Sequence, residues 1–104
     1  MSDPSPGQVL ERMVTWVCGL QQYEPEVIFL NEEYESALLT ASIMEPHEAL
    51  QLTELKDNTI RCRLLGVPLR FTPKVKGAWV RFRGGKTPKT VPAPPPTVPY
   101  LKGR

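Results

Sequence analysis

Hydrophobic residues recur every three or four positions near the start of the chain. Between residues 8 and 22 they share one side of a helix, whereas Glu11, Thr15 and Cys18 fall on the opposite side. This spacing predicts an amphipathic helix over 8–22 that ends before Pro25. The side expected to face a core consists of Val9, Leu10, Met13, Trp16, Val17 and Leu20.

A second helical segment follows, with negative charge at its start. Asn31 is a suitable N-cap, acids in the first turn are favoured by the helix dipole, and Pro46 closes the segment. The apolar run at 27–30 fits either a short strand or a lead-in to this helix. The expected apolar face of the helix consists of Tyr34, Ala37, Leu38, Ala41 and Met44. The acids, which are also candidate contacts for a protein partner, are Glu32, Glu33 and Glu35.

After residue 50 the spacing of the apolar residues changes from helical to alternating. Segments 50–53 and 60–64 alternate on either side of a turn at 56–58, and segments 67–71 and 78–83 alternate again. Pro68 indicates an edge strand or a bend. We therefore expect an α+β fold, in which two N-terminal helices are followed by a small antiparallel β-meander.

The chain divides into one domain and two terminal segments. Prolines and a glycine predict a flexible N-terminus over 1–7, and a glycine pair ends a single domain of residues 8–85. Residues 86–104 hold six of the twelve prolines and four bases. Such a composition favours extended, polyproline-like backbone and offers little to a core, so we expect a disordered Pro-rich basic tail.

Charge is divided between the two halves of the chain. Residues 1–55 hold ten acids and one base, a balance of −9, whereas residues 56–104 hold twelve bases and one acid, a balance of +11. The net charge of +2 conceals this division. Asymmetry of this kind indicates a polyanionic partner, with nucleic acid as the leading candidate.

The strand alternation sorts the second half into two sides. Apolar residues are expected to face the helices, so five arginines and a tryptophan project together on the other side. Arginine binds phosphate through paired hydrogen bonds, and an exposed aromatic ring stacks with any base. The inward set is Ile60, Cys62, Leu64, Leu69, Phe71, Val80 and Phe82. With four nearby lysines, the candidate nucleic-acid-binding residues are Arg61, Arg63, Arg70, Lys74, Lys76, Trp79, Arg81, Arg83, Lys86 and Lys89.

Other kinds of chemistry find little support. Cys18 and Cys62 have no second cysteine or histidine at ligand spacing, so we expect neither a disulfide framework nor a metal site. We expect no cofactor, no small-molecule substrate and no enzyme activity, with a thiol enzyme that uses Cys18 as the alternative in that class. The apolar run at 27–30 is too short to span a membrane and the N-terminus lacks signal-peptide features, so a soluble cytoplasmic protein is expected.

Two functional hypotheses remain. The first is a small non-enzymatic accessory protein that binds nucleic acid or a nucleoprotein assembly through the basic sheet face and tail. The second is a protein-interaction module whose acidic and basic halves pair with a larger complex or with another copy of the chain. Its tail would contribute Pro92, Pro95 and Tyr100, since Pro92 and Pro95 follow Lys89 in a basic PxxP pattern. An open arginine face favours the first hypothesis, and a face neutralised by the helical acids favours a structural role.

Overall fold

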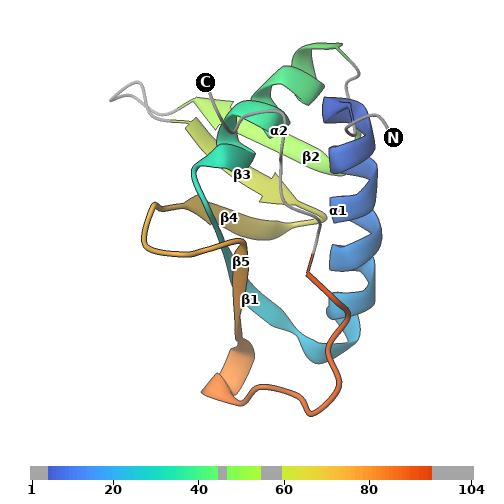
Figure 1. The fold of residues 1–104 in the computed structure, drawn as a ribbon. Helices are drawn as coiled ribbons and strands as arrows, with labels where there is room; N and C mark the ends of the chain where they lie inside the picture. Colours follow the sequence, from blue (N-terminus) through green and yellow to red (C-terminus); the bar gives the residue numbers. More distant parts are fainter. Residues whose placement is uncertain (1–4, 45–46, 55–59, 95–104) are drawn as a thin grey trace.

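The computed structural model describes residues 5–44, 47–54 and 60–94, which form two layers (Figure 1). One layer is a five-stranded sheet, and the other contains two α-helices. This arrangement confirms the α+β class. The elements in chain order are α1 (Pro6–Leu20), η1 (Gln21–Tyr23), β1 (Pro25–Leu30), α2 (Glu33–Met44), β2 (Leu50–Glu54), β3 (Ile60–Leu64), β4 (Val67–Phe71), β5 (Ala78–Phe82) and η2 (Arg83–Gly85).

Helix α1 begins two residues earlier than the hydrophobic spacing predicts. Ser5 is its N-cap: the hydroxyl accepts a hydrogen bond of 3.2 Å from the backbone N–H of Gln8. The side-chain oxygen of Gln8 in turn accepts a bond of 2.9 Å from the Ser5 N–H. Pro6 occupies the first turn, where its missing N–H has no helical partner to lose. Pro6 and Gly7, which the sequence assigned to a flexible N-terminus, are therefore part of the helix start.

The sheet is mixed, and the predicted antiparallel meander is wrong. Its strand order is β2-β3-β4-β1-β5, with β1 parallel to β4 and antiparallel to β5. Because β1 lies between α1 and α2 in the chain, the two helices do not precede the sheet together. Ile28 and Leu30 of β1 belong to the main core, while Val27 is buried outside that cluster, in a strand that has a neighbouring strand on each edge. Pro68 lies in an interior strand, but the pairing of β4 with β1 begins only at Leu69.

The hairpin of β3 and β4 fixes which side chains face which way. Its two turn residues, Leu65 and Gly66, have φ values of 53° and 82°. Two consecutive positive φ values are typical of a type I′ turn, whose twist suits a two-residue hairpin. The resulting register pairs Leu64 with Val67 and Cys62 with Leu69. Since directly paired residues share a face, the predicted alternation of these strands is confirmed.

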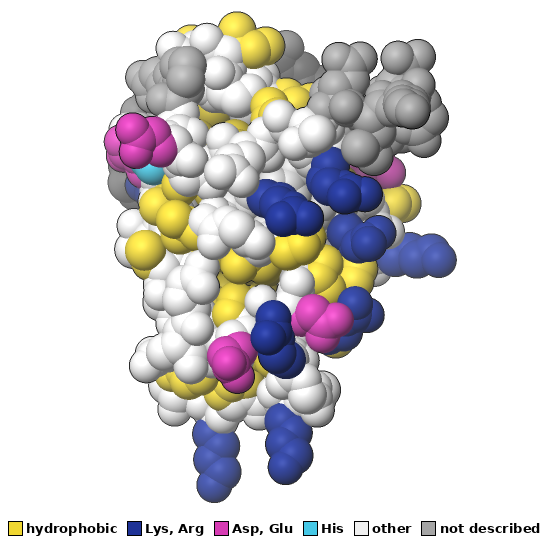
Figure 2. Space-filling view, turned by 180° about the vertical axis from the view of Figure 1, so that it is seen from behind, with side chains coloured by type: hydrophobic (Ala, Val, Ile, Leu, Met, Phe, Trp, Pro, Cys, Tyr) yellow, Lys and Arg dark blue, Asp and Glu magenta, His cyan; other side chains and the backbone are white. Residues whose placement is uncertain are grey.

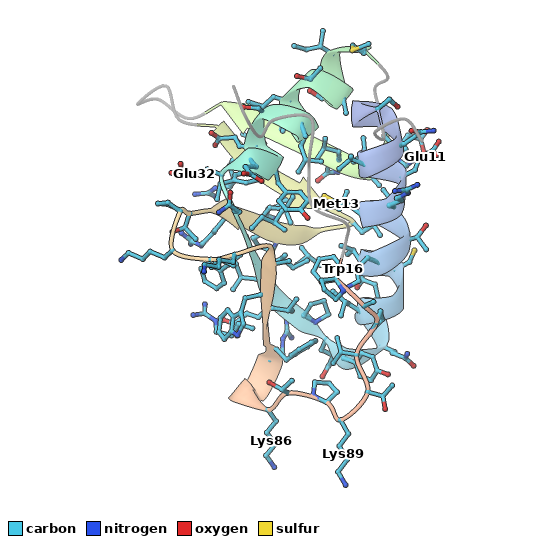
Figure 3. The ribbon with its side chains drawn as sticks, viewed as in Figure 1. Glu11, Met13, Trp16, Glu32, Lys86 and Lys89 are labelled. Carbon is cyan, nitrogen blue, oxygen red and sulfur yellow. The ribbon has the colours of Figure 1, made fainter. Side chains whose placement is uncertain are left out.

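The helices pack on one face of the sheet, which we call the inner face. Met13 and Trp16 of α1 are buried and point toward the sheet, whereas Glu11 lies on the exposed side of the helix (Figure 3). Most of the predicted inward set is buried or packs against this core. The confirmed residues are Cys62, Leu64, Leu69, Phe71, Val80 and Phe82, while the side chain of Ile60 lies outside the described residues.

Asn31 joins the start of α2 to the loop between β4 and β5. Its side-chain oxygen accepts a hydrogen bond of 3.1 Å from the N–H of Glu33, which supports the predicted role at the helix start. The amide of the same side chain donates to the carbonyl of Val75 at 2.8 Å. The Asn31 N–H donates to the carbonyl of Gly77 at 2.9 Å. One residue thus holds the β4–β5 loop against the end of β1.

The first part of the C-terminal segment packs on the domain, which differs from the expectation of a tail that is disordered from residue 86. Val91 contacts the core, and the indole N–H of Trp16 donates a hydrogen bond of 3.1 Å to the carbonyl of Pro92. A Cβ placed on Gly19 would lie 2.8 Å from Cγ of Pro92, so the proline ring sits directly against the glycine of α1. This segment runs back along α1 on the helix side of the sheet (Figure 1).

Candidate functional site

The side of the sheet that faces away from the helices brings half of the predicted nucleic-acid-binding residues together. We call it the outer face. The pairs Phe29–Arg70, Phe29–Trp79 and Val27–Arg81 lie on it, as do Arg63–Pro68 and Thr53–Arg61. All of the predicted residues within these pairs are exposed in the structure. They are Arg61, Arg63, Arg70, Trp79 and Arg81.

An aromatic pair occupies the β1–β5 side of the outer face. The ring centroids of Phe29 and Trp79 are 5.4 Å apart, with the ring planes inclined at 41°. Phe29 is half-buried between its neighbours, whereas 55% of Trp79 remains exposed. An exposed indole held by a second ring is a preformed apolar surface on which a planar group can stack.

Positive charge surrounds this apolar centre and is only partly neutralised. The guanidinium of Arg81 lies 3.5 Å from the carboxylate of Glu26 and 5.9 Å from the centroid of the Phe29 ring. Among the side chains that the structure describes, this is the ion pair found on the outer face. Figure 2 shows dark blue side chains gathered around exposed hydrophobic surface on this side of the molecule. The face therefore combines an accessible aromatic ring with three arginines, Arg61, Arg63 and Arg70, that have no ion pair with a described carboxylate.

The remaining predicted bases lie outside the outer face. Lys74 and Lys76 are exposed in the loop between β4 and β5. Arg83 is exposed just after β5, and its backbone N–H donates to the carbonyl of Glu24 at 3.0 Å. Lys86 and Lys89 are exposed and project from one end of the molecule, away from the sheet (Figure 3). The structure thus divides the predicted bases into a fixed sheet group and a more distant group.

The predicted acidic partner site lies elsewhere. Glu33 and Glu35 belong to the first turn of α2, which packs on the inner face, and Glu32 directly precedes this helix. None of these acids forms an ion pair with the outer-face arginines within the described part of the chain. Pro92, predicted to bind a partner, packs on α1. Pro95 and Tyr100 lie outside the described residues.

Phe29 and Glu26 are site residues that the sequence did not indicate. Both belong to β1, and the choice between a strand and a helix lead-in for 27–30 stayed open, so no face could be assigned to them. The run at 27–30 is apolar throughout, so no alternation of polar and apolar residues marked Phe29 as an outer-face residue. Phe29 matters because it holds the ring of Trp79 in place.

The grouping of possible metal ligands and the ionisation of two buried groups, Cys62 and Tyr34, bear on metal and covalent chemistry. No group of three or more His, Cys, Asp or Glu side chains within them could hold a metal ion. Burial, followed by the charge of Glu35, raises the pKa of the Cys62 thiol to about 11. Burial, followed by the charge of Glu33, raises the pKa of Tyr34 to about 12. Both groups therefore stay protonated at neutral pH, unlike an activated nucleophile.

Comparisons with known proteins do not assign this chain to a family. No family model, no curated protein and no solved structure gives a significant match to this chain. In the part of the chain that the structure describes, no helix is long and apolar enough to cross a membrane.

Proposed function

We propose that this chain is a small non-enzymatic accessory protein that binds nucleic acid, alone or within a nucleoprotein assembly, through the outer face of its sheet. The main contacts run from arginine to phosphate, so sequence selectivity is weak. An intracellular location belongs to the same proposal, because Cys18 and Cys62 are both free thiols, as is usual in reducing compartments.

The openness of the arginine face is the observation that supports this proposal most strongly. The helices pack on the opposite side of the sheet, and the arginines are exposed. In a protein whose basic surface served only its own fold, the acids of α2 would neutralise these arginines. Instead Arg61, Arg63 and Arg70 have no ion pair with a described carboxylate. Positive charge without an acidic partner attracts a polyanion. Because these arginines lie on strands, the backbone loses no further conformational entropy when they bind.

Titration of a labelled oligonucleotide at several salt concentrations tests the proposal. We expect binding at low salt that weakens steeply as salt rises, because each neutralised phosphate releases a counterion. Each contact adds about 0.7–0.9 to the slope of log K against log salt. A complete lack of binding at low salt contradicts the proposed function.

A matched pair of variants locates the contacts. Arg61→Glu plus Arg70→Glu reverses two charges on the outer face, and Lys86→Glu plus Lys89→Glu reverses two charges away from it. Both double variants change the net charge equally. We expect the first to lower the salt slope by about 1.4–1.8, the value for two lost contacts, and the second to lower it less. Equal decreases in the salt slope would show that binding depends on the overall charge of the protein and not on the outer face.

The second candidate function is association with an acidic or basic surface of a protein, including another copy of this chain. The observation that favours it is the separation of charge between exposed acids next to α2 and exposed arginines on the outer face. Contacts between such unlike surfaces are head-to-tail and extend into chains unless they close. Sedimentation of the purified protein at low and high salt tests this function, which requires oligomers or a retained protein partner at low salt.

A further inference from the structure

Resting on the proposed function, we infer that the outer face selects single-stranded nucleic acid, with an unpaired base stacked on Trp79 and phosphates at Arg70 and Arg61. Trp79 is the residue that distinguishes this class of ligand from a duplex. This selectivity follows from how the sheet aligns aromatic and basic side chains in one row.

The row runs across the strands. Phe29 is paired with Trp79 on one side and with Arg70 on the other. Continuing the β3–β4 register, in which Cys62 pairs with Leu69, places Arg61 beside Arg70. From Arg61 to Trp79 the row therefore crosses three strand spacings, about 14 Å in all. A ligand that uses the whole row must offer negative charge at one end and a planar apolar group at the other.

The exposed indole decides between single-stranded and double-stranded ligands. In a duplex each base is stacked and paired, so its faces are closed to a side chain on a flat surface. Unpaired bases present open faces, and aromatic residues on sheet surfaces bind them by stacking. Trp79 is suited to this contact because Phe29 holds it at 5.4 Å while 55% of its surface stays exposed. A duplex would use the arginines and leave the indole unused.

The charges in and beside the row are also arranged for a nucleic-acid strand that crosses the sheet. Arg81, nearest in the chain to Trp79, is partly engaged by Glu26 at 3.5 Å. Arg70 and Arg61 have no ion pair with a described carboxylate. The strongest attraction for phosphate therefore lies on the far side of Phe29 from Trp79. A single strand can reach both regions at once, since its bases and phosphates are not held in a helix.

Competition between a single-stranded oligonucleotide and a duplex of the same sequence, at one salt concentration, tests this inference. We expect the single strand to bind more tightly. Trp79→Ala should weaken single-strand binding by roughly 5- to 150-fold, the range given by stacking of one base, and leave duplex binding unchanged. Trp79→Phe keeps a ring and should restore much of the affinity. Circular dichroism of each variant establishes that it is folded.

The outcomes separate this inference from the proposed function. Equal affinity for both ligands, with no effect of Trp79→Ala, overturns the single-strand inference and leaves nucleic-acid binding standing. Loss of all binding by the wild-type protein at low salt overturns both. Displacement of the oligonucleotide by a polyglutamate peptide at equal charge concentration would assign the face to acidic proteins and also overturn the inference.

Discussion

The two faces of the sheet are built from the same strands but have opposite surroundings. On the inner face, side chains such as Leu64 and Leu69 are buried beneath α1, α2 and the segment around Val91. On the outer face, alternate residues of the same strands are arginines, and the apolar centre around Phe29 is only partly covered. Strand alternation therefore creates two surfaces at once, one completed within the chain and one left open.

The comparison shows where function is best sought in a small α+β domain. The inner face contains most of the buried side chains that stabilise the fold. On the outer face, an exposed tryptophan leaves apolar surface in contact with water. Arginines that have no ion pair with a described carboxylate repel one another, so the stability of the fold explains neither feature. Features that a fold does not need are the strongest internal indication of a ligand.

Neighbouring residues on opposite faces give the largest expected difference in stability. Leu69→Ala removes a buried side chain and should lower the free energy of unfolding by about 2–5 kcal/mol. Arg70→Ala, one position along the same strand but exposed, should change it by no more than about 0.5 kcal/mol. Urea unfolding of both variants is the measurement. Similar decreases in the free energy of unfolding would mean that the outer face contributes to stability as much as the inner face does.

Removal of residues 86–104, which deletes contacts on the helix side of the sheet, should have a smaller effect on the free energy of unfolding. The truncated chain loses the packing of Val91 and the hydrogen bond from Trp16 to Pro92, which together should lower the free energy of unfolding by about 2 kcal/mol. A chain that ends at residue 94 keeps these contacts and is the matched control. If both truncations unfold at the same denaturant concentration as the full chain, the docked segment contributes nothing.

Gly19→Ala should produce the smallest change in the free energy of unfolding. It also shows whether Pro92 packs against Gly19 of α1. In a chain that ends at residue 85, alanine should stabilise the helix by about 0.5–1 kcal/mol relative to glycine. In the full chain the gain should shrink or reverse, because the new Cβ would lie 2.8 Å from Cγ of Pro92. An equal gain in both backgrounds would show that the segment does not rest there.

The sequence was sufficient to predict the facing of the strands but not their order. Alternation over 60–64 and 67–71 assigned Arg61, Arg63 and Arg70 correctly, because the period of a strand depends only on local geometry. The insertion of β1 between β4 and β5 depends on pairing between distant segments, which no local pattern contains. The run at 27–30 also lacks alternation, because Val27 and Phe29 on the outer face are apolar like Ile28 and Leu30 on the inner face.

The docked C-terminal segment was missed for a related reason. Val91 and Pro92 are single apolar residues within a proline-rich stretch and show no helical or strand period. Their site on α1 depends on Gly19 leaving room and on Trp16 offering its N–H. Both residues had been assigned to the helix, but neither sequence position indicates what lies against it. Phe29 was missed as part of the site because its strand was not assigned.

The two indole N–H groups provide the most direct test of the central claim that the open outer face binds nucleic acid. Trp16 is 6% exposed and bonded to Pro92 on the helix side, whereas Trp79 is 55% exposed on the outer face. In a nitrogen–proton NMR spectrum, with Trp79→Phe used for assignment, a single-stranded oligonucleotide should shift the Trp79 indole peak and leave that of Trp16 in place. Movement of the Trp16 peak alone, or of neither peak when binding is saturated, would contradict the account.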